Sequence, residues 1–239
     1  MEFDGADLFS SYETRTFAYD ASADGRATLK QASIGWTAGG CDHVWSDVLP
    51  RVVALHGKRM LAGSSCLELG AGCGLVGLFA AHFATLVDIT DGDVEEVALI
   101  RQNCDEHAAG NAQAAHLEWG ASAAREALKA GTLRAATYDV ILASQVVYVP
   151  AAIGPLVETM ATLLSADGVV WLYNDAVSTT STQAECRRLL ETALVTHDLV
   201  AEPAIGASEQ QLSLPRDALF PMHVNTYLLR IVRRQPTPQ

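Results

Sequence analysis

The sequence predicts an α/β fold in which a parallel sheet is covered by helices on both faces. Short apolar runs alternate with segments of helical periodicity from residue 65 onward, and a glycine-rich turn joins the first run to the first helix. The chain has 239 residues, of which 49% are apolar and 18% charged. One compact core is therefore expected without help from metals or disulfides.

Composition excludes several classes of protein. The net charge of −12 disfavours nucleic acid as a partner, because an acidic chain repels phosphate backbones. The five cysteines are too scattered for a disulfide framework, and no spacing of Cys or His indicates a metal site. The N-terminus is polar and no apolar run has the length of a membrane span, so we expect neither a leader nor a membrane partner. We expect a cytoplasmic monomer, with the nucleus as the alternative location.

The N-terminal segment is read as an extension of the main domain. Residues 14–33 alternate in short polar and apolar steps around Asp24-Gly25, which predicts a β-hairpin with a D-G turn. We therefore divide the chain into a hairpin extension, residues 1–40, and a main domain, residues 41–239. The main domain begins with a predicted helix over residues 43–57, whose apolar residues recur at helical spacing.

Strands and helices then alternate. The helix over 93–108 carries acidic residues in its first turn, where the helix dipole favours them. The predicted strands cover residues 65–70, 85–91, 115–120, 138–148, 168–175 and 224–234, and the other predicted helices cover 73–84, 153–164 and 182–194.

The glycine turn after the first strand predicts a ligand site. Gly70, Gly72 and Gly74 expose backbone N–H groups at the start of a helix, although glycines there can also serve packing alone. Asp91 closes the next strand about 20 residues later, where a carboxylate accepts the ribose hydroxyls of an adenosine group. Asp91 could equally be a turn residue before Gly92. An adenosine site of this kind is shared by nicotinamide-dependent and methyl-donor enzymes.

Glu68 favours the methyl donor. It lies on the strand immediately before the glycines, where it would face the reactive end of the cofactor. A pyrophosphate would be repelled by this carboxylate, whereas the sulfonium and ammonium of S-adenosylmethionine would be attracted.

Several motifs in the same order resemble a known family. "LELGAGCGLVGL" with "TDGD", "EWG" and "VVY" is similar to the seven-β-strand S-adenosylmethionine-dependent methyltransferases, specifically methyltransferase family 16, which contains many protein-lysine methyltransferases. The resemblance covers most of the chain and implies a Rossmann-like seven-stranded sheet. It implies that S-adenosylmethionine is bound by Trp45, Gly70, Ala71, Gly72, Asp91, Trp119 and Ala143, to which the charge argument adds Glu68.

The resemblance also implies where the acceptor meets the enzyme. The family carries an acidic residue and a Tyr, in the spacing D-x-x-Y, after the fourth strand. This chain has Gln145 and Tyr148 in those places, so the Tyr is kept and the acid is not. An amide orients an amine lone pair but does not stabilise an ammonium by charge, so the departure puts lysine specificity in doubt. Asn174 and Asp175 end the next strand on the same rim, and Asp175 is the nearest alternative carboxylate.

The sequence is compatible with several functions. The first is methylation of a protein side chain, with lysine as the first choice. The others are methylation of arginine, an amide or a small molecule, and a non-catalytic module that binds the cofactor. A nicotinamide-dependent oxidoreductase is disfavoured by Glu68 and by the absence of a Tyr-x-x-x-Lys pair.

Overall fold

The computed structural model of the chain describes residues 12–18, 26–32, 46, 48–107, 110–174, 181–203 and 227–235. This part of the chain forms a seven-stranded sheet and a separate two-stranded hairpin. Among these residues, no helix combines the length and the apolar character needed to cross a membrane.

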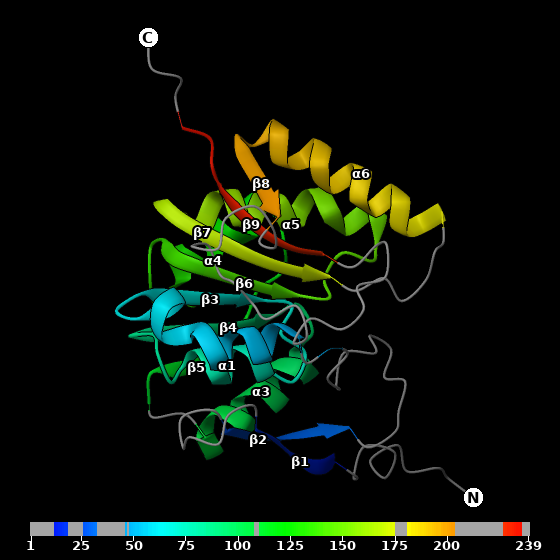
Figure 1. Cartoon of the computed structure of the whole chain (residues 1–239). Coiled ribbons are helices and arrows are strands. Elements are labelled where there is room, and N and C mark those ends of the chain that lie inside the picture. The colour runs from blue at the N-terminus through cyan, green and yellow to red at the C-terminus, as the bar shows by residue number, and fades with distance from the viewer. Residues whose placement is uncertain are drawn as a thin grey trace, which may run out of the picture.

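The large sheet is mostly parallel (Figure 1). Its strand order is β5-β4-β3-β6-β7-β9-β8, and the neighbours from β5 to β7 all pair in parallel. The strand β9 is antiparallel to both β7 and β8. The strands are β3 (Ser65–Leu69), β4 (Leu86–Asp91), β5 (Ala112–His116), β6 (Tyr138–Ser144), β7 (Leu164–Asn174), β8 (Leu199–Pro203) and β9 (Tyr227–Arg233).

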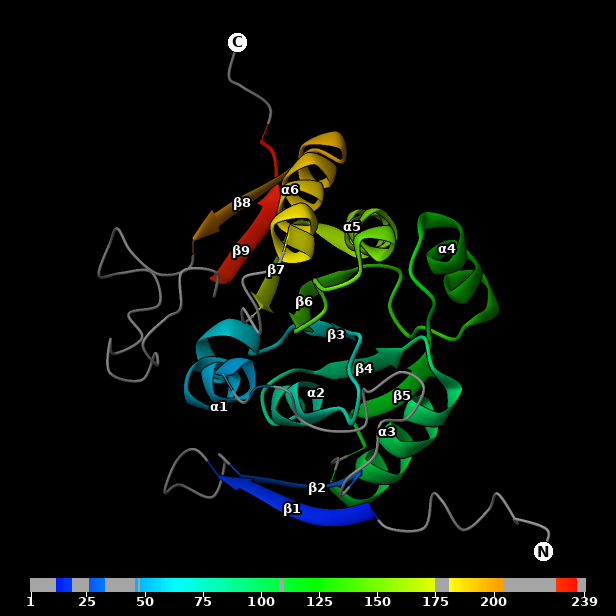
Figure 2. The same ribbon diagram turned by 90° about the vertical axis from the view of Figure 1, so that its right-hand side faces the viewer.

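Within the described residues, six helices cover the two faces of this sheet; the sequence predicts helices on both faces, but only five of these six. Figure 2 shows α1, α2 and α3 on one face and α4, α5 and α6 on the other. The helices are α1 (Val48–Leu61), α2 (Leu75–Ala80), α3 (Val94–His107), α4 (Ala121–Ala130), α5 (Pro150–Leu163) and α6 (Ser181–Thr196).

The alternation of side chains along each strand builds one core on each face. In β3, Cys66 belongs to the core under α1, α2 and α3, whereas Leu67 and Leu69 belong to the core under α4, α5 and α6. In β6, Leu142 and Ile141 divide in the same way. Glu68 has the same parity as Cys66 and therefore faces the side of α2.

The order of the strands predicts where a ligand binds. The chain leaves β3 toward α2 on one face and leaves β6 toward α5 on the other, although β3 and β6 are neighbours. In open α/β sheets a crevice forms outside the carboxyl ends of two such strands. The glycine turn follows β3, and Gln145 and Tyr148 follow β6, so both flank this position.

The predicted hairpin is present in the described residues. The strand β1 (Tyr12–Ala18) pairs antiparallel with β2 (Arg26–Ala32), with Phe17 opposite Ala27. The hairpin lies beside α3 and α2, and β2 contacts both helices (Figure 2). The predicted turn at Asp24-Gly25 lies outside the described residues.

The structure corrects several predicted boundaries. The third strand covers 112–116 rather than 115–120, so Trp119 follows the strand instead of ending it. The segment AQAAH has no β-branched or aromatic residue, so strand propensities do not predict a strand there. The helix predicted over 73–84 is limited to the six residues of α2. No element predicted from the sequence corresponds to α4 or β8.

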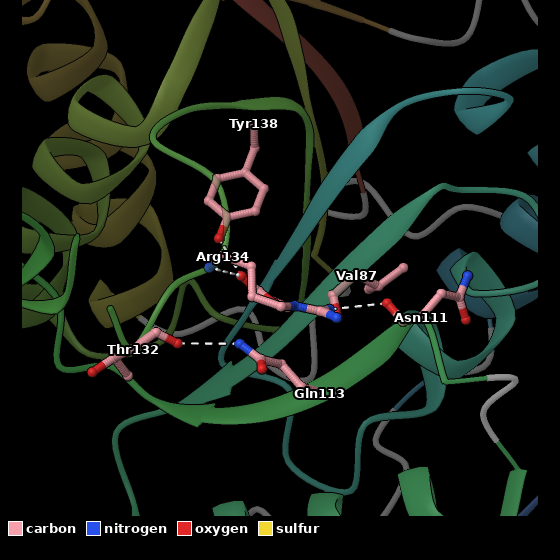
Figure 3. Close-up of polar contacts among 7 residues, drawn as sticks. Val87, Asn111, Gln113, Thr132, Arg134 and Tyr138 are labelled. Atoms are coloured by element: carbon pink, nitrogen blue, oxygen red, sulfur yellow. Dashed lines mark hydrogen bonds and ion pairs between the residues drawn. The ribbon is translucent and has the colours of Figure 1, made fainter. Parts of the chain in front are cut away.

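A cluster around Asp88 ties the strands together near their amino ends (Figure 3). The Asp88 side chain is fully buried and accepts hydrogen bonds from Arg134 Nε at 2.6 Å, from Arg134 N at 2.8 Å and from the Tyr138 hydroxyl. Nη2 of Arg134 donates to the carbonyls of Val87 at 2.6 Å and Asn111 at 2.9 Å. This Asp88 cluster joins β4, the residue before β5 and the segment leading into β6.

Candidate functional site

The turn between β3 and α2 depends on glycine. Gly70, Gly72 and Gly74 have φ values of 64°, 55° and 83°, in the left-handed region where side chains are disfavoured. A Cβ at Gly70 would also lie 2.8 Å from Val146 Cγ1 and 3.0 Å from Trp119 Cζ2. Gly70 is therefore enclosed between the segment after β6 and the segment after β5.

Asp91 is joined directly to this turn. Its Oδ2 accepts a hydrogen bond from Gly72 N at 3.0 Å, and its Oδ1 accepts one from Asp93 N at 3.0 Å. The residue is 8% exposed, and burial raises the pKa of its carboxyl even though the N–H groups of Gly72, Asp93 and Gly92 lower it. Asp91 thus acts as a turn residue, which is one of the two interpretations of the sequence, and its carboxyl lies at the end of β4 beside the glycine turn.

Glu68 lies beneath the turn. Its carboxyl is buried, and Oε2 accepts a hydrogen bond from Gly77 N in α2 at 2.7 Å. Burial raises the pKa of Glu68 from its ordinary 4.5 to about 8, although the hydrogen bond from Gly77 opposes the shift. The carboxyl is therefore mostly protonated at neutral pH. The attraction between Glu68 and a cationic cofactor that the sequence predicts therefore requires Glu68 to ionise when that cofactor binds.

Trp119 and Ala143 approach the turn from the neighbouring strands. Trp119 is half-buried, and its indole lies against Gly70. The segment that carries it is anchored because Leu117 N donates to the Asp91 carbonyl at 2.9 Å. Ala143 is fully buried in β6, where it pairs with Leu69 of β3.

The segment after β6 is held in an unusual conformation. Gln145 has a φ of 60°, which is left-handed and rare for a residue with a side chain. Gln145 N donates to the Tyr173 carbonyl at 2.8 Å, and Val147 N donates to Asn174 Oδ1 at 3.0 Å. The end of β7 thereby fixes this segment, and strained residues held in this way gather at functional sites. Tyr148 follows with 54% of its surface exposed.

Most of the predicted site residues that the structure describes lie close to one another. Gly72 is bonded to Asp91, Gly70 contacts both Trp119 and Val146, and Val146 stands between Gln145 and Tyr148 in the chain. The predicted cofactor turn and the predicted acceptor segment are therefore in direct contact. Trp45 and Asp175 lie outside the described residues.

Sequence reasoning missed two residues that contact the turn. Thr90 in β4 and Asn103 in α3 are fully buried polar side chains with hydrogen bonds to backbone atoms at the turn. The only signal in the sequence is a polar residue inside an otherwise apolar face, and that signal does not name the partner.

The chain matches known proteins in sequence. A family model described as lysine methyltransferase matches residues 30–183. The protein N-lysine methyltransferases METTL21A of Xenopus tropicalis and Mus musculus are 32% and 34% identical to the chain over 133 residues. Each alignment covers 54% of this chain, which spans only 58% of the length of these relatives.

A solved structure supports the fold. The Thermus thermophilus 16S rRNA N2 G1207 methyltransferase RsmC, in complex with AdoMet and guanosine, aligns with a TM-score of 0.60 at 18% identity. The alignment covers 95% of this chain and 51% of that protein. At 18% identity, this structural similarity shows the Rossmann-like methyltransferase fold and nothing about activity.

Proposed function

Because the chain belongs to the lysine methyltransferase family, we propose that it is an S-adenosylmethionine-dependent N-methyltransferase acting on a protein side chain, with lysine as the first choice. The observation that carries the proposal is the bond between Gly72 N and Asp91 Oδ2, which joins the glycine turn to the acid at the end of β4. Relatives named protein N-lysine methyltransferase support the same assignment.

The residues present fit S-adenosylmethionine. A carboxylate has about four acceptor positions, so Asp91 retains capacity for a ribose hydroxyl beside its backbone donors. The indole of Trp119 offers an apolar flat face next to Gly70 for the adenine ring. Gly70, Ala71, Gly72, Ala143 and, outside the described residues, Trp45 complete the proposed binding set.

The chemistry requires position more than acid or base strength. When bound, S-adenosylmethionine supplies an activated methyl group for an in-line displacement. Gln145 and Tyr148 would orient the acceptor nitrogen, the amide oxygen and the hydroxyl each accepting a hydrogen bond from it. The apolar side chain of Val146, packed at the turn, would help to keep water away from the reaction.

A second candidate acceptor follows from Gln145. A neutral amide does not stabilise a charged ammonium, so it suits an acceptor that is already uncharged, such as an amide or a small-molecule nitrogen. A module that binds the cofactor without turnover is the remaining alternative.

Cofactor identity is tested first by ligand binding. S-adenosylhomocysteine should raise the melting temperature of the parent protein and NAD should not. Asp91→Ala should lose this response. Asp93→Ala is the matched control, because it removes an exposed carboxylate from the same segment, whose Oδ1 accepts a hydrogen bond from Glu95 N at 2.8 Å within α3 and none from the glycine turn among the described residues. A response to NAD alone would overturn the proposal.

Acceptor class is tested with methyl-labelled S-adenosylmethionine and a cell extract, with protein separated from small molecules before counting. A discrete labelled protein that disappears with Asp91→Ala supports protein methylation and provides the substrate for mass spectrometry. Label only in the small-molecule fraction contradicts a protein acceptor. Binding without label in any fraction favours the non-catalytic module.

A further inference from the structure

Asn103 links α3 to the glycine turn. Its side chain is fully buried, and Nδ2 donates to the Cys73 carbonyl at 2.9 Å across 30 residues of sequence. The neighbouring side chains Ile100 and Cys104 are apolar members of the core on this face. A buried amide is costly unless it is hydrogen-bonded, and the bond to the Cys73 carbonyl supplies one partner for the Asn103 amide.

Thr90 holds the same turn from β4. Its side chain is fully buried, and Oγ1 donates to the Glu68 carbonyl at 2.6 Å. Its own carbonyl accepts a hydrogen bond from Ala71 N at 3.0 Å. Thr90 therefore fixes the chain on both sides of Gly70.

These bonds act on a segment with unusual freedom. Glycine populates left-handed and right-handed conformations almost equally, and this segment contains Gly70, Gly72 and Gly74. Without side-chain bonds from outside, the turn would sample other conformations of similar energy. The side-chain bonds to the carbonyls of Glu68 and Cys73, together with the backbone bond from Ala71 N to Thr90, favour the conformation seen in the structure.

We propose that Asn103 and Thr90 are positioning residues for cofactor binding, which hold the glycine turn in its binding conformation. The inference rests on the proposed function, because it presumes that the turn receives S-adenosylmethionine. Apparent affinity falls in proportion to the fraction of molecules in the competent conformation. Loss of either tie should therefore weaken binding through the turn itself.

The first test compares Asn103→Leu with Asn111→Leu. Asn111 is the matched control, since its Nδ2 also donates to backbone carbonyls, of Ala81 at 2.8 Å and Ala84 at 3.0 Å, but these lie beyond α2, away from the turn. Calorimetry with S-adenosylhomocysteine should show about tenfold weaker binding for Asn103→Leu, because the hydrogen bond that holds the Cys73 carbonyl is lost. Asn111→Leu should bind within about twofold of the parent while losing comparable stability to urea.

The second test uses Thr90→Val and Thr90→Ser. Thr90→Val removes the donor to the Glu68 carbonyl, whereas Thr90→Ser keeps it. Serine should restore the affinity that valine loses, again about tenfold, which a merely structural loss would not predict. If Asn103→Leu does not fold, the comparison of Thr90→Val with Thr90→Ser still tests the positioning role.

The outcomes separate this inference from the proposed function. Parent protein that does not bind S-adenosylhomocysteine overturns the proposed function. Parent protein that binds, with Asn103→Leu no weaker than Asn111→Leu or Thr90→Ser as weak as Thr90→Val, overturns the positioning role alone.

Discussion

Replacing Glu68 by glutamine should change how the stability of the protein depends on pH. Glutamine has the same shape and keeps an oxygen to accept the hydrogen bond from Gly77 N, which is 2.7 Å long in the parent. It does not titrate. Any pH dependence that disappears in Glu68→Gln therefore belongs to the Glu68 proton.

The sign and size follow from burial. The pKa of Glu68 is about 8 in the folded protein and near the ordinary 4.5 in the unfolded chain. Between these values the folded state keeps a proton that the unfolded state has lost, so the free energy of unfolding falls as pH rises. Each pH unit is worth about 1.4 kcal/mol, which gives a loss of about 5 kcal/mol across the range.

Urea denaturation of both proteins at several pH values from 5 to 9 measures this effect. The parent should lose stability relative to Glu68→Gln as pH rises, and the gap should stop growing above about pH 8. The slopes against urea should stay equal, which shows that the denatured states are comparable. Parallel stability curves for the two proteins would refute the argument that burial keeps Glu68 protonated.

Three further substitutions test other parts of the molecule. Arg134→Met leaves the buried Asp88 carboxylate without its ionic partner, so urea denaturation should show a loss of about 3 kcal/mol, with affinity for S-adenosylhomocysteine unchanged; unchanged stability would contradict the role of the Asp88 cluster. Tyr148→Phe should lower turnover in the labelled-methyl assay about tenfold without weakening cofactor binding, because it removes one hydroxyl from the acceptor side; an equal rate would remove Tyr148 from the site. Gln145→Asp should raise lysine methylation, since a carboxylate stabilises an ammonium; an unchanged or lower rate would indicate that the acceptor is not a lysine.

Local patterns predicted the centre of the fold and missed parts of its periphery. The strands β3 and β4 are apolar runs closed by clear turn signals, so their positions follow from sequence alone. The helix α4 buries only Ala124, and β8 is a five-residue edge strand that ends in proline. Both elements are short and contribute few large buried side chains to the core, so neither stands out as a long apolar run in the sequence.

Some residues of the candidate site could be predicted from the sequence and others could not. The glycines and Asp91 belong to short motifs, which are visible without a structure. The bond from Asn103 to Cys73 joins residues 30 positions apart, and no spacing rule connects them. The protonation of Glu68 depends on the helix that covers it, and a sequence does not report burial of one carboxyl.

The left-handed backbone at Gln145 affects which residues can replace Gln145, and therefore which acceptor the site can prefer. Asn and Asp adopt this conformation several times more readily than other side chains, so the backbone here suits an acid at least as well as it suits glutamine. Two of the bonds that fix the segment are donated by the backbone groups Gln145 N and Val147 N, and an aspartate at position 145 would supply the same backbone donor. An exchange of the side chain at this position would therefore keep both bonds. A single replacement would thus offer a different group to the acceptor while these two backbone bonds still hold the segment after β6.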